Sequence, residues 1–171
     1  MTGVQTCALP IYSPSGRLAE TIPERLEQHP AQLNFPGEAG EVRYGEGIFV
    51  GYRGLQKLGN QPSYPFGHGL TYTTFEFSDL QAEVTEITPE TALGEVVLTV
   101  SVTVTNTGSR SGVAVPQLYI GYPVSSVDRP PWELRGFRHL ELGPGEKFFE
   151  HLVEGLHENK SIAPIVCLSP S

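Results

Sequence analysis

The sequence predicts a mainly β protein of the β-sandwich class, and three observations lead to this prediction. The 171 residues include 19 Gly and 15 Pro, which supply many turns and leave little room for long helices. Several short segments alternate apolar and polar residues with a period of two, as half-buried strands do. Clusters of turn-forming residues separate these segments, and this arrangement favours an antiparallel sandwich.

Residues 13–71 come before the alternating part and show no long periodic element. Three prolines, at positions 14, 23 and 30, limit helix to one short turn around Glu24–Gln28. The apolar run Ile48–Val50 is short enough for a buried strand or for the start of a covered segment. Because this region lacks the pattern needed for a core of its own, we expect it to be the end of a larger domain.

The clearest strand is in VVLTVSVTVTNTG, residues 96–108. Its even positions from Leu98 to Val104 are apolar, whereas the odd positions from Thr99 to Thr105 are Thr or Ser, which indicates one buried and one exposed face. Asn106-Thr107-Gly108 then predicts a turn, since Asn and Gly tolerate positive φ.

Other segments repeat the pattern more briefly. In residues 72–80, Phe75 and Phe77 share one face, and the segment 116–122 begins with Pro116, which predicts an edge strand or a bulge. Residues 136–142 alternate, 143–147 read as a turn, and 148–154 predict a last strand. These are about five strands, whereas a complete sandwich of this kind needs about seven.

Composition excludes several function classes. The formal net charge of −8 disfavours an electrostatic hold on nucleic acid or on an anionic membrane. No apolar run approaches the ~20 residues that cross a bilayer. Cys7 and Cys167 lie near opposite ends, so they predict neither a disulfide framework nor a metal site, and the compartment, secreted or cytoplasmic, stays open.

Two terminal segments do not follow the pattern of the rest. Residues 1–12 have an apolar patch without a basic region before it, so they do not predict a secretory signal, and we interpret them as a non-native leader. The segment after Val153 loses the alternation, and we interpret residues 154–171 as an aberrant tail. Asn159-Lys160-Ser161 is a glycosylation sequon within it.

No residue is assigned a catalytic, cofactor-binding or metal-binding role. His68, in the turn of YPFGHGLTYTTFEF, has no acid, thiol or metal partner nearby in sequence, so we interpret it as a packed turn residue. Glu38, Glu41 and Glu46 form a carboxylate cluster, yet their spacing does not define a catalytic pair, and Gly-flanked glutamates are usually solvated.

Aromatic residues offer a weaker alternative, a sugar-binding platform. Most of them are better interpreted as packing anchors in a Gly- and Pro-rich segment. These are Tyr44, Tyr52, Tyr64, Tyr72, Phe75 and Phe77. Trp132 and Tyr122 are the best candidates for exposed sugar contacts on a free-standing β-sandwich. A carbohydrate-binding module and a scaffold protein therefore stay open as alternative functions.

Long stretches of the sequence, in order, resemble the C-terminal part of the family 3 glycoside hydrolases, most closely their β-glucosidase branch. These stretches are PSGRLAETIPERLEQHPAQLNFPGEAGEVRYGEGIFVGYRG, YPFGHGLTYTTFEFSDL, VTVTNTGSRSGVAVPQLYIGYP and RPPWELRGFRHLELGPGEK. The resemblance implies that residues 13–71 end an α/β sandwich domain and that residues 72–153 form an incomplete fibronectin-III-like β-sandwich. It also implies that YPFGHGLTYTTF joins the two, with Gly67 and Gly69 allowing the reversal.

The same resemblance implies a β-glucosidase that releases terminal non-reducing β-D-glucosyl residues from glucosides or oligosaccharides without a cofactor. Such enzymes use two carboxylates, a nucleophile and a general acid/base. In this family both lie in motifs upstream of the part that is resembled. We therefore expect this chain by itself to be inactive, and we expect no nucleic-acid or membrane partner.

Overall fold

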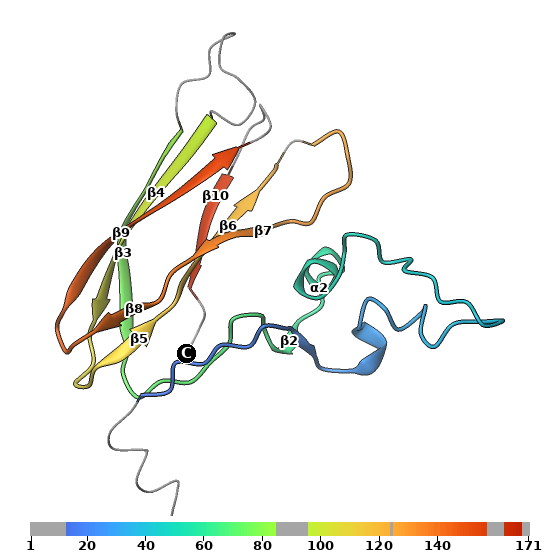
Figure 1. Ribbon diagram of the computed structural model, residues 1–171, viewed down its shortest axis with the longest axis horizontal. Coiled ribbons are helices and arrows are strands. Elements are labelled where there is room, and N and C mark those ends of the chain that lie inside the picture. The colour runs from blue at the N-terminus through green and yellow to red at the C-terminus, as the bar shows by residue number, and fades with distance from the viewer. Residues whose placement is uncertain (1–12, 85–95, 124, 157–162, 169–171) are drawn as a thin grey trace, which may run out of the picture.

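The computed structural model describes residues 13–84, 96–123, 125–156 and 163–168. Figure 1 shows a β-sandwich on one side and, on the other, an extended part made of residues 13–71, which we name the arm. Residues 1–12, the sequon at 159–161 and the end of the predicted tail at 169–171 lie outside the described residues.

The described residues of the sandwich form antiparallel strands in small sheets. In chain order these are β3 (Phe75–Val84), β4 (Val96–Asn106), β5 (Gly112–Ala114), β6 (Pro116–Gly121), β7 (Glu133–Phe137), β8 (Leu140–Leu142), β9 (Lys147–Leu156) and β10 (Ala163–Leu168). The strand orders are β3-β4-β9, β10-β6-β7 and β5-β8. The predicted mainly β sandwich is confirmed.

Strand β4 buries its predicted apolar face. Leu98 and Val100 pack with Leu118 and Ile120 of β6, so this cluster joins two sheets. A second cluster contains Val102 and Val104 together with Ala114, Leu140 and Leu142. The partly buried Phe75 and Phe77, which the sequence predicts to share one face, both pack against it. The period-two pattern thus places the core where the sequence indicates.

The turn after β4 forms for a different reason than the one predicted. Neither Asn106 nor Gly108 is among the residues with positive φ. Instead, the buried Asn106 side chain accepts hydrogen bonds from Thr73 Oγ1 and Gly108 N, at 2.6 and 3.0 Å. Side-chain hydrogen bonding, rather than left-handed backbone, holds this turn.

Of the two alternatives that Pro116 predicts, the edge strand is wrong, whereas an irregularity is present two residues further on, where the pairing of β6 with β7 shifts register between Leu118 and Tyr119. Strand β6 is the central strand of its sheet, between β10 and β7. Pro116 is its first residue, immediately after the break from β5, and there its missing N–H interrupts no continuous ladder. Further along the chain, the alternating segment 136–142 divides into the end of β7 and all of β8.

The number of strands exceeds the five that the sequence indicates. The short β5 and β8 have only three residues each, too few to reveal a period of their own. Strand β10 lies in the predicted tail and pairs with β6 from Ala163 opposite Gly121 to Leu168 opposite Pro116. The five predicted strands do not include β10, and β10 pairs with a side of β6 that would otherwise be open.

The arm has little regular structure. It contains β1 (Ile22–Pro23) paired with β2 (Pro62–Tyr64), a 3₁₀ turn η1 (Leu26–Gln28) and one short helix, α2 (Tyr52–Lys57). The 3₁₀ turn falls within the predicted Glu24–Gln28. Ile48–Val50 is not a strand, and both Ile48 and Val50 are about half exposed, so the prediction of a buried strand is wrong in this chain.

Candidate binding cleft

A cleft of about 460 Å³ lies between the arm and the sandwich. The arm contributes Thr21 and residues of α2 and of the segment 59–66, and the sandwich contributes Gln117, Tyr119 and Trp132. The cleft thus exists only because segments far apart in sequence meet. Its volume falls within the range of ~300–1,000 Å³ that is typical of small-molecule sites.

Aromatic rings form one wall of the cleft. Tyr52, the first residue of α2, packs against Phe66 at 5.5 Å between ring centroids and meets Tyr119 of β6 edge-to-face at 5.8 Å. The Tyr52 hydroxyl also accepts a hydrogen bond from Leu134 N of β7 at 2.9 Å. One side chain therefore fixes the helix to the sandwich through both packing and a polar contact.

The other polar groups of the wall are amides and hydroxyls. Gln117 is buried, and its Oε1 accepts a hydrogen bond from Tyr119 Oη at 3.0 Å. Gly67 has a φ of 82°, and a Cβ at this position would approach Gln117 Nε2 to 2.3 Å. A side chain at residue 67 would therefore meet both a disfavoured backbone and the Gln117 amide.

His68 lies in the predicted turn, and its backbone forms two hydrogen bonds there. Its carbonyl accepts from Leu18 N at 2.8 Å, and its N–H donates to Pro65 O at 3.0 Å. The imidazole packs against the Tyr64 ring at 5.1 Å between centroids. These contacts agree with the packed turn residue that the sequence predicts.

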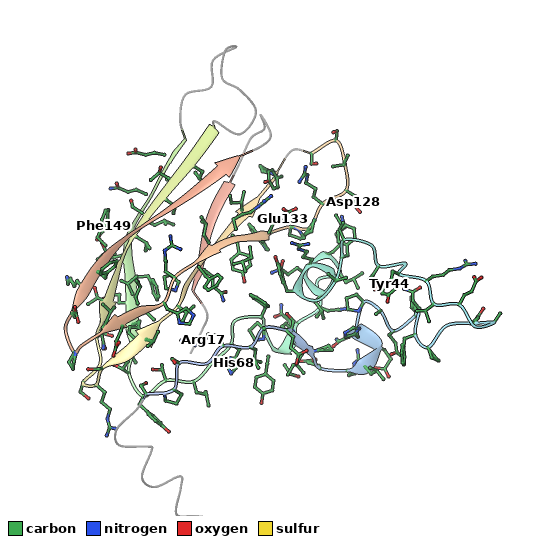
Figure 2. All side chains as sticks on the ribbon, viewed as in Figure 1. Arg17, Tyr44, His68, Asp128, Glu133 and Phe149 are labelled. Atoms are coloured by element: carbon green, nitrogen blue, oxygen red, sulfur yellow. The ribbon has the colours of Figure 1, made fainter. Side chains whose placement is uncertain are left out.

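Gly69 is required for close approach rather than for an unusual backbone angle, in contrast with the sequence-based expectation. A Cβ here would lie 2.3 Å from Gly16 O and 2.7 Å from Arg17 Cδ. The Arg17 Nη1 donates to Gly69 O at 3.0 Å. Burial lowers the pKa of the Arg17 guanidinium, and Figure 2 shows Arg17 at the end of the arm next to the sandwich.

The three glutamates of the arm lie outside the cleft. Glu38 and Glu41 form an isolated bridge through their backbones, and both residues are exposed. Glu46 accepts a hydrogen bond from Asn34 Nδ2 at 3.1 Å. None of them lines the cleft, and within the described residues no three acidic, His or Cys side chains gather as metal ligands.

The aromatic candidates separate into two groups. Tyr44 is almost fully exposed on the arm, as Figure 2 shows, so it is not a packing anchor. Tyr64 and Tyr72 are about half exposed, although the Tyr64 ring packs against His68. Tyr52, Phe75 and Phe77 pack as anchors. Trp132 lines the cleft, whereas the Tyr122 ring packs against the Arg129 guanidinium, with 4.7 Å between Arg129 Cζ and the ring centroid.

Two residues of the cleft carry no signal in the sequence. Thr21 lies between two prolines of an irregular segment, and Gln117 lies in a strand whose neighbours are apolar. Their importance arises from the fold: Thr21 is buried, and its Oγ1 has no hydrogen-bond partner in the described part of the chain. The cleft therefore combines aromatic rings, amides and one unsatisfied buried hydroxyl.

Comparison with known proteins defines the class. The profile of the fibronectin type III-like domain matches residues 114–148. The thermostable β-glucosidase B of Acetivibrio thermocellus is 46% identical over 135 residues, which is 79% of this chain and 17% of the relative. The chain thus spans about a sixth of the length of this curated relative. It carries a fibronectin type III-like sandwich of the kind found in glycoside hydrolases.

Solved structures agree over most of the chain. The β-glucosidase 3B of Thermotoga neapolitana, in complex with glucose, aligns with a TM-score of 0.73 and 37% identity over 84% of this chain and 19% of that one. The GH3 β-glucosidase of Bifidobacterium adolescentis aligns with a TM-score of 0.76 and 31% identity, over 91% of this chain and 26% of that one. Over most of its length, this chain is similar in sequence and structure to a part of these β-glucosidases.

In the described residues, no helix has the length and apolar character needed to cross a membrane.

Proposed function

We propose that this chain is the C-terminal part of a β-glucosidase that hydrolyses terminal non-reducing β-D-glucosyl residues. The observation that supports this most strongly is the agreement of sequence and fold with β-glucosidases over about four-fifths of the chain. The complete enzyme would use a carboxylate nucleophile and a second carboxyl group as general acid and base, about 5–5.5 Å apart for retention.

We further propose a division of labour within the chain. Residues 13–71 end an α/β domain, and residues 72–153 belong to the fibronectin-III-like sandwich. The arm's exposed apolar side chains support this division, because Leu33, Phe35 and Leu58 lie largely in solvent and only Leu55 is among the buried hydrophobic residues of the arm. A domain that completes the arm would cover them.

This chain by itself should not hydrolyse glucosides. The residues that line its cleft include no Asp, Glu or His, so the cleft supplies neither a nucleophile nor a general acid. The role of this part would be structural, positioning the end of the α/β domain against the sandwich through Tyr52, Phe66 and the turn around His68.

An aryl β-glucoside assay tests this proposal at two levels. The complete reading frame that encodes the chain, extended upstream of Ser13, should give a protein that releases the aryl group, while residues 1–171 should give no turnover above background. An inactive complete protein would contradict the proposed activity. Turnover by residues 1–171 that disappears in Glu41→Gln or Glu46→Gln would contradict the structural role.

A further inference from the structure

We propose that the cleft between the arm and the sandwich is a non-catalytic binding site for a small neutral carbohydrate, a mono- or disaccharide. Its walls consist of residues from the arm, of Gln117 and Tyr119 from strand β6 and of Trp132 just before β7, and they contain no carboxylate. The proposal rests on the charge, the shape and the hydrogen-bonding groups of these walls.

The charge of the cleft selects a neutral ligand. Every residue that lines it is uncharged at neutral pH, although the whole chain has a formal net charge of −8. An anionic ligand would therefore find no cationic partner in the wall and an unfavourable field around it. A cationic ligand would lose its hydration without gaining a carboxylate.

The shape and apolar surface suit a pyranose ring. A pyranose has a face of C–H groups and a rim of hydroxyls, so it needs an aromatic surface with polar groups around its edge. Tyr52, Phe66, Tyr119 and Trp132 provide four rings in the walls of a cleft of about 460 Å³. Pockets of this kind, mostly apolar with a few convergent polar groups, are typical of specific ligand sites.

The polar groups can recognise hydroxyls. Gln56, Asn60 and Gln61 each offer one amide oxygen and two N–H donors, and a sugar hydroxyl both donates and accepts. Thr21 is buried and its Oγ1 is closed off from solvent, so the recognition of hydroxyls rests on these three amides.

The single tryptophan of the chain, Trp132, lies in the wall and provides the experiment. Tryptophan fluorescence of residues 1–171 is followed during titration with glucose and with cellobiose, and with betaine as an osmolyte control. We expect a saturable change with at least one of the two sugars and no saturable change with betaine. Isothermal calorimetry on the same samples detects binding that leaves the fluorescence unchanged.

Variants of Gln56 test the assignment of the site. Gln56→Leu removes the amide at similar side-chain length and should weaken binding about 5- to 10-fold, whereas Gln56→Asn keeps an amide and should weaken it less. Gln81→Leu is the matched control, because Gln81 is an exposed residue of β3, whose sheet does not line the cleft. Circular dichroism and urea unfolding confirm that each variant is folded.

Three results would overturn the proposal: no saturable signal and no heat with either sugar, unchanged affinity in Gln56→Leu, or an equal loss in Gln81→Leu. If a hydrophobic dye bound in the cleft and sugars failed to displace it, an apolar occupant would replace the carbohydrate. The binding assay requires no hydrolysis, so its failure is distinct from failure of the proposed enzymatic function.

Discussion

Asn106 connects three separate parts of the sandwich through one buried amide. Its Oδ1 accepts from Thr73 Oγ1 and Gly108 N, and its Nδ2 donates to Arg110 O at 2.8 Å and Leu142 O at 2.9 Å. All the hydrogen-bonding capacity of a buried amide is thereby used. Such satisfied networks stabilise a unique arrangement, and losing one member leaves several buried groups unpaired.

Asn106→Leu should therefore lower the free energy of unfolding by about 2–4 kcal/mol, since it removes both the donors and the acceptor of this network. Urea unfolding of residues 1–171 measures the effect. Ser109→Ala, at an exposed position of the same turn, is the control and should change stability by less than about 0.5 kcal/mol. Equal midpoints for Asn106→Leu and wild type would contradict this structural role.

The joint between arm and sandwich gives a second prediction at the scale of one residue. Gly69→Val should lower stability by about 1–3 kcal/mol, because its Cβ would overlap the backbone oxygen of Gly16. Gly16→Ala is a matched control, since a Cβ at Gly16 meets no atom within 4 Å. If Gly69→Val and Gly16→Ala had the same melting temperature within error, the backbone around Gly16 would move to accommodate the new side chain, and the prediction would be wrong.

At the scale of elements, helix α2 is held to the sandwich by Tyr52 more than by its ion pair. Lys57 of α2 pairs with Asp128, but both side chains are largely in solvent, and exposed pairs contribute little free energy. The Tyr52 ring and hydroxyl contact β6, β7 and the turn at Phe66. Partly buried aromatic contacts combined with a hydrogen bond to backbone give the stronger attachment.

Strand β10 gives the element-scale prediction. It pairs with β6 over six residues, so a chain that ends at Leu156 loses this ladder and exposes one side of β6. We expect a loss of stability on the order of 2–4 kcal/mol, since each hydrogen bond contributes ~0.5–1.5 kcal/mol net. The open strand should also promote self-association, measurable by size-exclusion chromatography with light scattering.

A chain that ends at Leu168 is the matched control for this truncation, because it keeps all six pairs. It should match the full chain in urea midpoint and in molar mass. If the Leu156 truncation matches it as well, β10 contributes nothing to the stability of the sandwich.

At the scale of the whole molecule, the two parts differ in how they bury apolar side chains. The sandwich encloses two clusters between its sheets. The arm, which extends away from the sandwich in Figure 1, leaves its apolar side chains largely in solvent. The exposed apolar side chains of the arm are Ile22, Leu26, Leu33, Phe35, Val42, Tyr44, Ile48, Val50, Leu58, Tyr64 and Leu70.

The exposed arm should make residues 1–171 bind a hydrophobic dye, as apolar patches do. The double variant Leu33→Glu, Phe35→Glu should reduce dye fluorescence while changing the free energy of unfolding by less than about 0.5 kcal/mol, because both side chains are exposed. Leu55→Gln, at a buried position of the same arm, should instead destabilise the chain and raise dye binding. Unchanged dye fluorescence in the double variant would place the dye site elsewhere.

The sequence by itself determined the sandwich class, the buried face of β4 and the resemblance to family 3 glycoside hydrolases. These depend on local patterns: alternation with period two decides which side chains share a face, and long ordered motifs identify relatives. Only the tertiary structure decided that β10 pairs with β6, that Gly69 faces the Gly16 backbone and that Thr21, Gln117 and Trp132 line one cleft. The physical reason is that such contacts join segments separated by tens of residues, and no short-range pattern encodes which of these segments meet.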